Sequence, residues 1–110
     1  AGERARGRRL FQASLKLDPD DHNSLISLGA LACSEGRPRE ALSLYDRAGK
    51  ALLAKDALAD WAGARALALE RLGRAAEAKK QVAAILSYPG LPAARRKEFS
   101  AYFSRLDKSA

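Results

Sequence analysis

The stretch from Ser24 to Ala48, SLISLGALACSEGRPREALSLYDRA, decides the fold of this chain. In its first half, Leu25, Leu28 and Ala32 recur at steps of three and four residues, so they share one face of a helix. The second half repeats this spacing with four apolar residues, Ala41, Leu42, Tyr45 and Ala48. The stretch therefore predicts two amphipathic helices that pack through these two faces.

Three residues define the turn and the crossing of these helices. Gly36 suits the left-handed position that ends a helix, and Pro38 suits the first turn of the next one. Gly29 lies inside the first helix, where glycine costs about 1 kcal/mol relative to alanine. We therefore expect the backbone of a neighbouring helix to pass close to Gly29.

The spacing of these residues resembles the tetratricopeptide repeat (TPR) family. The family pattern has a large apolar residue, Leu-Gly, a packing residue, a turn glycine, and then Ala, an aromatic residue and Ala. The matching residues are Leu25, Leu28, Gly29, Ala32, Gly36, Ala41, Tyr45 and Ala48. The run Leu17–Asp21 is similar to the linker between repeats. The resemblance implies a helical scaffold, which serves many functions.

The rest of the chain is divided on the same pattern. We expect one all-α domain over residues 1–110, built from antiparallel helix-turn-helix repeats stacked as a short right-handed superhelix. The expected segments are the second helix of a truncated repeat (1–18), a complete repeat (21–55), a divergent repeat (57–88) and a C-terminal capping helix (91–107). The second helix of the complete repeat is expected to run to about Lys55, with a break at Asp56. Arg95, Arg96, Lys97 and Glu98 are expected to form the polar outer face of the capping helix.

The divergent repeat departs from the pattern at one position. Its turn glycine, Gly73, lies 37 residues after Gly36, against a usual period of about 34. Arg65 stands where the first copy has Leu28. Two interpretations are open: the arginine extends its charge to solvent from a packed stem, or the helix is rotated. Rotation would turn a different set inward, namely Trp61, Ala64, Ala68 and Leu72.

Composition excludes several classes of function. Cys33 is the single cysteine and His22 the single histidine, so we expect no disulfide, no cysteine-rich metal site and no cofactor. No run of 18 apolar residues occurs, so no membrane-spanning helix is expected. The chain lacks a signal-peptide pattern, which leaves the compartment open and favours the cytoplasm. It opens inside an apparent helix, and we interpret it as a fragment of a longer protein.

The net charge of +7 is spread unevenly. Residues 1–16 and 74–110 are basic, whereas 17–73 are slightly acidic. Nucleic acid is therefore not an expected partner, because a continuous basic groove is not indicated. Four arginines near the start could meet phosphate or anionic lipid, and a solvated helix face is the simpler interpretation. They are Arg4, Arg6, Arg8 and Arg9.

Three further residues have both a functional and a structural interpretation. Cys33 is a reactive thiol or, more simply, a small buried apolar residue. His22 follows Asp20 and Asp21 at a helix start, where a capping or surface role is favoured over catalysis. Trp61 is an exposed binding anchor or a packing residue, and packing is favoured. No catalytic constellation is present, so we expect no enzyme activity.

The TPR resemblance places ligands in a concave groove lined by the first helices of the repeats. The partner-binding residues that it implies are Asn23, Ile26, Ser27, Ala30 and Ser34 from one copy, and Asp60, Gly63, Leu67, Glu70 and Arg71 from the next. Members that grip heat-shock chaperone tails use lysine and asparagine there. Here those places hold Ile26, Ala30, Gly63 and Leu67, so that ligand is disfavoured and a peptide with apolar anchors is favoured.

Three functions compete at this point. The first is a scaffold that binds a protein or peptide partner in the groove. The second is a spacer within a longer superhelix, whose contacts would be neighbouring repeats. The third is a regulatory domain attached to an enzyme elsewhere in the chain. Secretion chaperones of the family are also short repeat arrays of this kind, but the resemblance to them is not specific enough to adopt. For the first function, Leu67→Glu or Ile26→Lys should abolish binding, and charge reversal at Arg95 and Arg96 should not.

Overall fold

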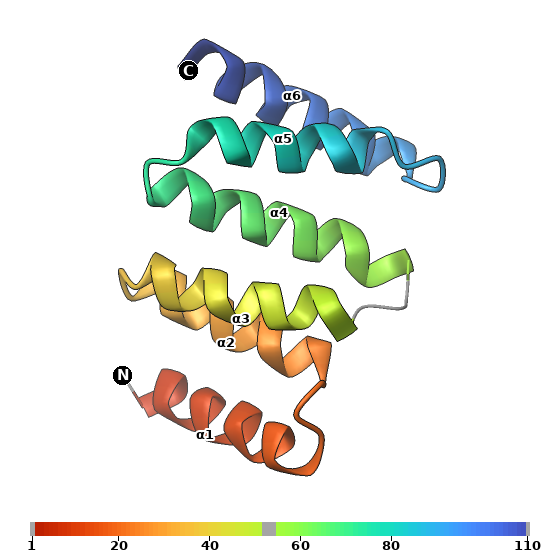
Figure 1. Ribbon diagram of the computed structural model, residues 1–110. Coiled ribbons are helices and arrows are strands. Elements are labelled where there is room, and N and C mark those ends of the chain that lie inside the picture. The colour runs from red at the N-terminus through yellow and green to blue at the C-terminus, as the bar shows by residue number, and fades with distance from the viewer. Residues whose placement is uncertain (1, 52–54, 110) are drawn as a thin grey trace. The chain divides into compact units, whose positions relative to one another are not determined.

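The computed structural model describes residues 2–51 and 55–109, and in these ranges the regular structure is entirely helical. This confirms the all-α fold class. The helices are α1 (Gly2–Leu17), α2 (His22–Ser34), α3 (Pro38–Ala51), α4 (Lys55–Arg71), α5 (Ala75–Leu86) and α6 (Ala93–Ser109) (Figure 1).

The helices form two compact units, which we describe separately. The first unit contains α1, α2 and α3, and the second contains α4, α5 and α6. In the first, α2 packs against both α1 and α3; in the second, α5 packs against both α4 and α6. The division of the chain into one domain with four repeat segments stays a prediction.

The turns within the two helix pairs have the same geometry. Gly36 and Gly73 both lie in the left-handed region, with φ of 79° and 77°. After the first, the N–H of Arg37 donates to Ala32 O at 2.8 Å, and after the second, the N–H of Arg74 donates to Leu69 O at 2.8 Å. These bonds satisfy carbonyl groups at the helix end. The predicted roles of the turn glycines are confirmed.

The crossing of α2 and α3 is closed by an aromatic ring. Gly29 is buried beneath Tyr45, whose side chain is only 1% exposed. A Cβ added to Gly29 would lie 2.8 Å from Tyr45 Cζ and closer still to Cε1. The sequence correctly predicts a close neighbour at Gly29. The prediction that this neighbour is a helix backbone is wrong, because the Tyr45 ring fills the space.

In the second unit, different residues pack at the corresponding crossing of α4 and α5. Ala66 and Val82 occupy the positions of Gly29 and Tyr45, and both are fully buried. A larger residue on α4 is thus matched by a smaller one on α5, which conserves the packed volume. Helix α4 keeps the register of α2 at its main packing positions, because the buried residues Ala62, Ala66 and Leu69 correspond to the buried Leu25, Gly29 and Ala32. Of the set that a rotation would turn inward, Ala68 is buried, whereas Trp61, Ala64 and Leu72 are half-buried. The burial pattern therefore favours the register of α2 over a full rotation of the helix.

Arg65 is accommodated in this register by extending its charged end outward. Its side chain is half-buried, its Nη1 donates to Gln81 Oε1 at 2.9 Å, and its guanidinium lies 5.9 Å from the centroid of the Trp61 ring. The stem therefore packs while the charge is hydrogen-bonded near the surface. This is the first of the two interpretations that the sequence left open.

The boundary between α3 and α4 corrects the sequence prediction. Helix α3 ends at Ala51, and Lys55 opens α4 rather than ending α3. Asp56 consequently lies in the first turn of α4 and not at a break after α3. The expected continuation of α3 through residues 52–54 lies outside the described residues.

Candidate binding groove

The residues predicted to form the groove lie in two sets. Asn23, Ile26, Ser27, Ala30 and Ser34 lie on α2 in the first unit, and Asp60, Gly63, Leu67, Glu70 and Arg71 lie on α4 in the second. On α2, Ile26 and Ser27 are half-buried and the other three are exposed. A groove that joins the two sets stays a prediction. Of the α4 set, Gly63 and Leu67 line a depression against α6, Asp60 and Glu70 contact α6 residues, and Arg71 is exposed.

A depression of about 530 Å³ lies between α4 and α6. Its apolar part is built on Phe99, which is 5% exposed and whose ring lies 3.4 Å from where a Cβ on Gly63 would be. Leu67 borders it and is 37% exposed, which makes it an apolar side chain open to solvent beside a buried ring. The other wall residues also come from α6, namely Arg95, Glu98, Ala101, Tyr102 and Arg105.

One end of this α4–α6 depression is closed by an ion pair. Arg95 Nη2 lies 2.6 Å from Asp60 Oδ1, and Arg95 Nη1 donates to Glu98 Oε2 at 3.2 Å. The Arg95 guanidinium also lies 5.5 Å from the centroid of the Phe99 ring. Arg95 thus lines the depression, which corrects the prediction that it belongs to the polar outer face of a capping helix.

The other end carries a second link from α4 to α6. Arg105 meets Glu70 with two hydrogen bonds of 2.6 and 3.0 Å, and the Tyr102 hydroxyl donates to Glu70 Oε1 at 3.1 Å. The Arg105 hydrogen bonds are the main reason why the pKa of Glu70 lies below its usual value. Burial, followed by the hydrogen bond to Glu70, raises the pKa of Tyr102 to about 12. The two ends of the depression are therefore fixed by charged contacts.

Replacing Glu70 by glutamine should make the free energy of unfolding less dependent on pH in the acidic range. The folded pKa of Glu70 is lowered, so its carboxylate stabilises the fold above the unfolded pKa of about 4.3 and loses this effect as pH falls through the folded pKa. We expect Glu70→Gln to lower the free energy of unfolding by about 1 kcal/mol at pH 7. Urea unfolding from pH 7 to pH 2.5 measures the difference.

The difference between wild type and Glu70→Gln should shrink below about pH 4. The matched control is Glu98→Gln, a carboxamide change on the more exposed side chain that contacts Arg95. It should change stability by less than about 0.5 kcal/mol. A difference between wild type and Glu70→Gln that stays constant down to pH 2.5 would contradict the ionic role of Glu70.

Arg96 also differs from the sequence prediction. It is half-buried, and its Nη1 and Nη2 donate to Leu86 O at 2.6 Å and to Tyr88 O at 3.1 Å. These carbonyls end α5 and begin the turn to α6, so Arg96 ties the two helices together. Of the four residues assigned to the outer face, Lys97 is exposed as expected, whereas Glu98 is exposed but lines the depression beside Arg95.

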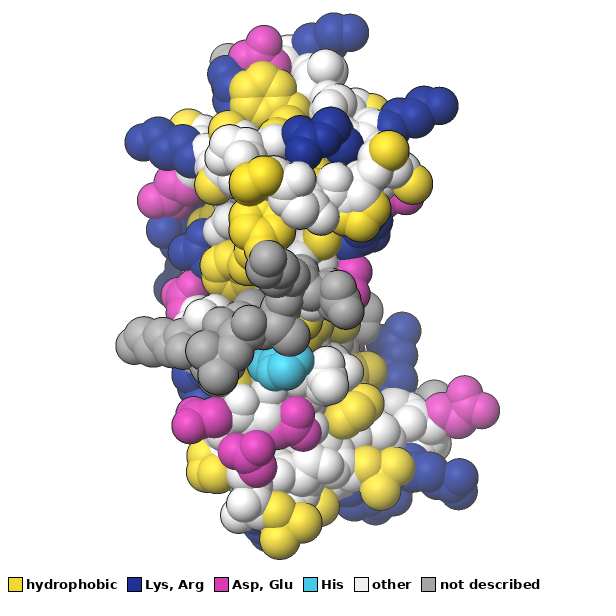
Figure 2. All heavy atoms as spheres, turned by 90° about the vertical axis from the view of Figure 1, so that its right-hand side faces the viewer, with side chains coloured by type: hydrophobic (Ala, Val, Ile, Leu, Met, Phe, Trp, Pro, Cys, Tyr) yellow, Lys and Arg dark blue, Asp and Glu magenta, His cyan; other side chains and the backbone are white. Residues whose placement is uncertain are grey.

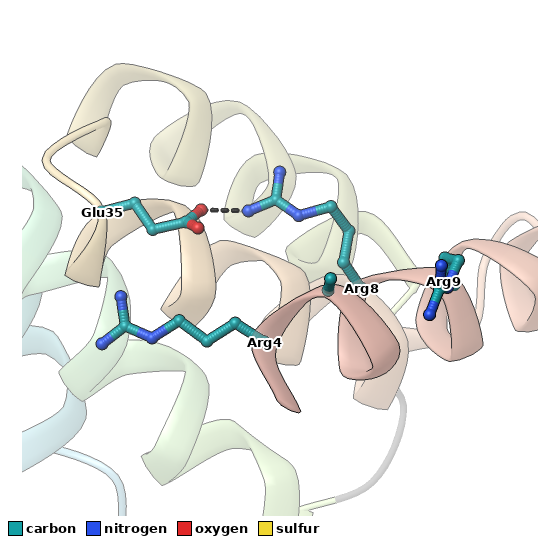
Figure 3. Close-up of a pocket in the computed structure, with 5 residues that line it drawn as sticks. Arg4, Arg8, Arg9 and Glu35 are labelled. Atoms are coloured by element: carbon teal, nitrogen blue, oxygen red, sulfur yellow. Dashed lines mark hydrogen bonds and ion pairs between the residues drawn. The ribbon is translucent and has the colours of Figure 1, made fainter. Parts of the chain in front are cut away.

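Three arginines of the basic cluster on α1 border a second depression. This depression has a volume of about 620 Å³ and is lined by Arg4, Ala5, Arg8, Arg9 and Glu35. Figure 3 shows Arg4 and Arg8 reaching towards the end of α2, while Arg9 points away from them. Because Glu35 contributes a carboxylate to the same space, the depression is not a uniformly cationic surface.

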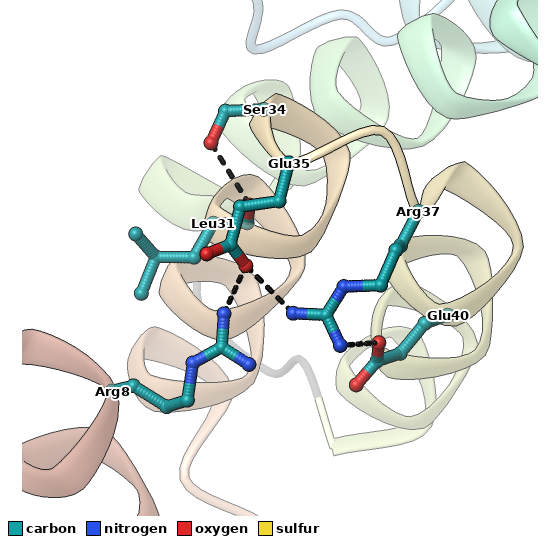
Figure 4. A network of polar contacts seen from close by, with 6 residues as sticks. All are labelled: Arg8, Leu31, Ser34, Glu35, Arg37 and Glu40. Atoms are coloured by element: carbon teal, nitrogen blue, oxygen red, sulfur yellow. Dashed lines mark hydrogen bonds and ion pairs between the residues drawn. The ribbon is translucent and has the colours of Figure 1, made fainter. Parts of the chain in front are cut away.

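Glu35 is the centre of an ion-pair network that joins α1 to the α2–α3 turn (Figure 4). It contacts Arg8 and lies 2.6 Å from Arg37 Nη2, and Arg37 Nη1 lies 2.7 Å from Glu40 Oε2. The hydrogen bond from Arg37, followed by that from Arg8, lowers the pKa of Glu35. The network gives Arg8 a structural role in holding α1 against α2.

The remaining candidate residues have structural surroundings. Cys33 is buried and is not in a disulfide, as expected for a packing residue. His22 opens α2 beside its N-cap residue Asp21, whose Oδ2 accepts a 2.7 Å hydrogen bond from Ser24. Trp61 is half-buried and faces residues of α5 such as Gln81 and Ile85. Within residues 2–51 and 55–109, no group of three potential metal ligands occurs.

Sequence reasoning missed the α6 wall of the depression. Arg95, Phe99, Tyr102 and Arg105 follow one another at steps of three or four residues and so share a helix face. This pattern was available, but α6 was interpreted as a cap with a solvated face. An aromatic pair flanked by arginines on one helix face is the signal that could have found it.

Comparison with known proteins supports the fold. No protein-family model matches the sequence, and a search of curated proteins finds no match. Among solved structures, the chain resembles SycD, the type III secretion translocator chaperone of Yersinia enterocolitica, with a TM-score of 0.80 and 18% sequence identity. The match covers 98% of this chain and 74% of SycD. The fold is therefore that of a TPR-like helical-repeat protein. In the described residues, no helix is both long and apolar enough to cross a membrane.

Proposed function

We propose that this chain is a TPR-family scaffold that binds a protein partner and holds a peptide segment of it in the α4–α6 depression. The observation that carries this proposal is the exposed Leu67 side chain beside the buried Phe99 ring, set between two charged links. An exposed leucine over a buried ring favours an apolar side chain from a ligand, because such burial is worth about 25 cal/mol per Å².

The size and the rim of the depression suit a short peptide. A volume of about 530 Å³ falls within the usual range of ligand sites, roughly 300 to 1,000 Å³. The Tyr102 and Arg105 side chains at one end and Arg95 at the other supply polar groups along the rim. These groups are held by Glu70 and Asp60, so they are ordered before a ligand arrives. Preordered rim groups reduce the entropy cost of binding.

The comparison with SycD supports binding over catalysis. SycD is a chaperone, and helical repeats provide extended surfaces for protein partners. In this chain, Asp60 and Glu98 contact Arg95 at one end of the depression, and Glu70 contacts Arg105 at the other. Charged groups that neutralise one another in pairs suit a binding surface, and a protein partner is therefore proposed in place of a small substrate.

A display selection tests this function. We expect immobilised wild-type protein to enrich 12-residue peptides that contain at least one large apolar residue, and labelled copies to bind with micromolar dissociation constants by fluorescence anisotropy. The groove-filling variant Gly63→Phe should fail to bind the same peptides. Selection that enriches no peptide over several rounds would contradict the proposal. It would favour the two alternatives, a spacer in a longer superhelix or a regulatory domain attached to an enzyme.

A further inference from the structure

The two ends of the α4–α6 depression differ in charge. At one end, Asp60 and Glu98 both contact the guanidinium of Arg95. Two carboxylates and one guanidinium leave a net charge of −1 on the described side chains that meet there. At the other end, Glu70 contacts Arg105, and this pair is neutral. The depression therefore has one end with an excess of negative charge, which we call the acidic end.

The carboxylates at the two ends also differ in their exposure to water. The side chains of Asp60 and Glu98 are 70% and 65% exposed. The side chain of Glu70 is only 23% exposed, and it accepts hydrogen bonds from Arg105 and Tyr102. A ligand that covers the depression therefore removes water mainly from the acidic end. Removing water from a carboxylate costs free energy unless a cation or a hydrogen-bond donor takes the place of the water.

Other charges of the second unit do not cancel this local excess. Arg96 donates to carbonyl oxygens at the end of α5, and Lys97 does not line the depression. Arg71 and Lys108 are exposed on α4 and α6 beyond the acidic end, so their positive charges lie towards Glu70. In the upper part of Figure 2, basic and acidic side chains are interspersed on one side of this unit, without a continuous patch of one sign. Salt screens exposed charges beyond about 8 to 10 Å, so the nearest groups decide which ligand fits.

We propose, as a refinement that rests on the proposed peptide site, that the partner segment carries a lysine or arginine at the acidic end while an apolar side chain of the same segment covers Leu67 and Phe99. Asp60 precedes Leu67 by seven residues, or about 10 Å along α4. An extended peptide spans this distance in about three residues. The occupant is therefore a short segment in which a basic residue lies close in sequence to a large apolar one.

The charges of the site favour this occupant over two others. An acidic segment would place its own carboxylate beside Asp60 and Glu98 in a partly dehydrated site, where like charges repel strongly. A wholly apolar segment would remove water from both carboxylates and replace it with no cation. A lysine or arginine side chain supplies the missing charge, and its aliphatic stem can pack on the apolar floor of the depression.

Peptide substitution tests the inference. Among the 12-residue peptides that wild type enriches, we expect most to carry lysine or arginine within about four residues of the apolar anchor. In the tightest of them, methionine in place of this basic residue should weaken binding about fivefold, and glutamate about 20-fold or more. Fluorescence anisotropy in low salt measures both losses. The fivefold loss should shrink when the salt concentration is raised to about 0.5 M, because salt screens the contact.

Substitutions in the protein test the same contact from the other side. In Asp60→Asn with Glu98→Gln, the ratio of the methionine-peptide to the lysine-peptide dissociation constant should fall from about five to one or below. In Glu98→Lys, the glutamate peptide should become a tighter ligand than the lysine peptide. Glu77→Gln is the matched control, a carboxamide change at an exposed carboxylate of α5, and should keep the wild-type ratio. Circular dichroism checks that each variant keeps its helical content.

The outcomes separate this inference from the proposed function. Peptides that bind wild type but not Gly63→Phe, and that bind equally well with lysine, methionine or glutamate, would overturn the inference and leave the peptide site in place. Enrichment of acidic peptides, with affinities that ignore the changes at Asp60 and Glu98, would also overturn it. If no peptide bound wild type, the inference and the proposed function would fail together.

Discussion

Gly29→Leu is expected to lower the free energy of unfolding by about 3 kcal/mol or more, and the melting temperature by roughly 12 °C or more. The reason is the Tyr45 ring, which lies 2.8 Å or less from any Cβ placed at Gly29 and is itself buried. A leucine there must displace the ring from the α2–α3 core. Thermal unfolding followed by circular dichroism measures the change.

Gly7→Ala is the matched control for a helical glycine. Its Cβ would meet only Phe11 of the same helix, at 3.8 Å. It should be neutral or stabilise the chain by up to about 1 kcal/mol, since alanine is the better helix former. Equal losses at Gly7 and Gly29 would show that the crossing does not depend on the space above Gly29.

The second unit supplies a compensating pair for the same site. Ala66 and Val82 pack where the first unit has Gly29 and Tyr45. Gly29→Ala should therefore cost less in a Tyr45→Val background than alone, by about 1 kcal/mol or more of coupling energy. Additive costs would contradict the equivalence of the two crossings.

Leu67→Glu is expected to weaken binding of a selected peptide at least 100-fold, equivalent to about 2.7 kcal/mol. The substitution removes the exposed apolar wall beside Phe99 and places a carboxylate where the ligand's apolar side chain would sit. A buried carboxylate without a partner is costly. Fluorescence anisotropy with the labelled peptide measures the affinity, and the helical signal should be unchanged.

Two controls separate the groove from the rest of the second unit. Ala83→Glu adds the same carboxylate at an exposed position of α5, and Lys97→Glu reverses a charge on the exposed side of α6. Both should bind the peptide within about threefold of wild type. Arg95→Glu, by contrast, should weaken binding, because Arg95 lines the depression. This replaces the sequence-based expectation that reversal at Arg95 is silent.

The first unit was largely predictable because its determinants are local. Gly36, Pro38 and the apolar spacing of α2 and α3 each act within a few residues, so the pattern fixes helix ends and buried faces. The contact between Gly29 and Tyr45 was only half predicted. The position of Gly29 indicates that another group packs closely against α2. Which group this is, here the Tyr45 ring, depends on the residue that α3 places there.

The candidate site was predictable on α4 but not on α6. Leu67 and Gly63 follow from the repeat pattern, because first helices are expected to line the groove. The roles of Arg95 and Arg96 depend on distant partners, Asp60 in one case and the end of α5 in the other. From sequence alone, a charged residue on an amphipathic helix is expected to face solvent. Its contacts with distant residues become visible only in the folded structure.

Backbone chemical-shift mapping of the ¹⁵N-labelled chain with a selected peptide tests the central claim most directly. The proposed site predicts that the largest shifts occur at Gly63, Leu67, Phe99, Tyr102 and Arg105, with small shifts on the exposed side of α5. The same peptide should leave the spectrum of Leu67→Glu nearly unchanged. Largest shifts at Arg4 and Arg9 of α1, with Gly63 and Phe99 unaffected, would contradict the account.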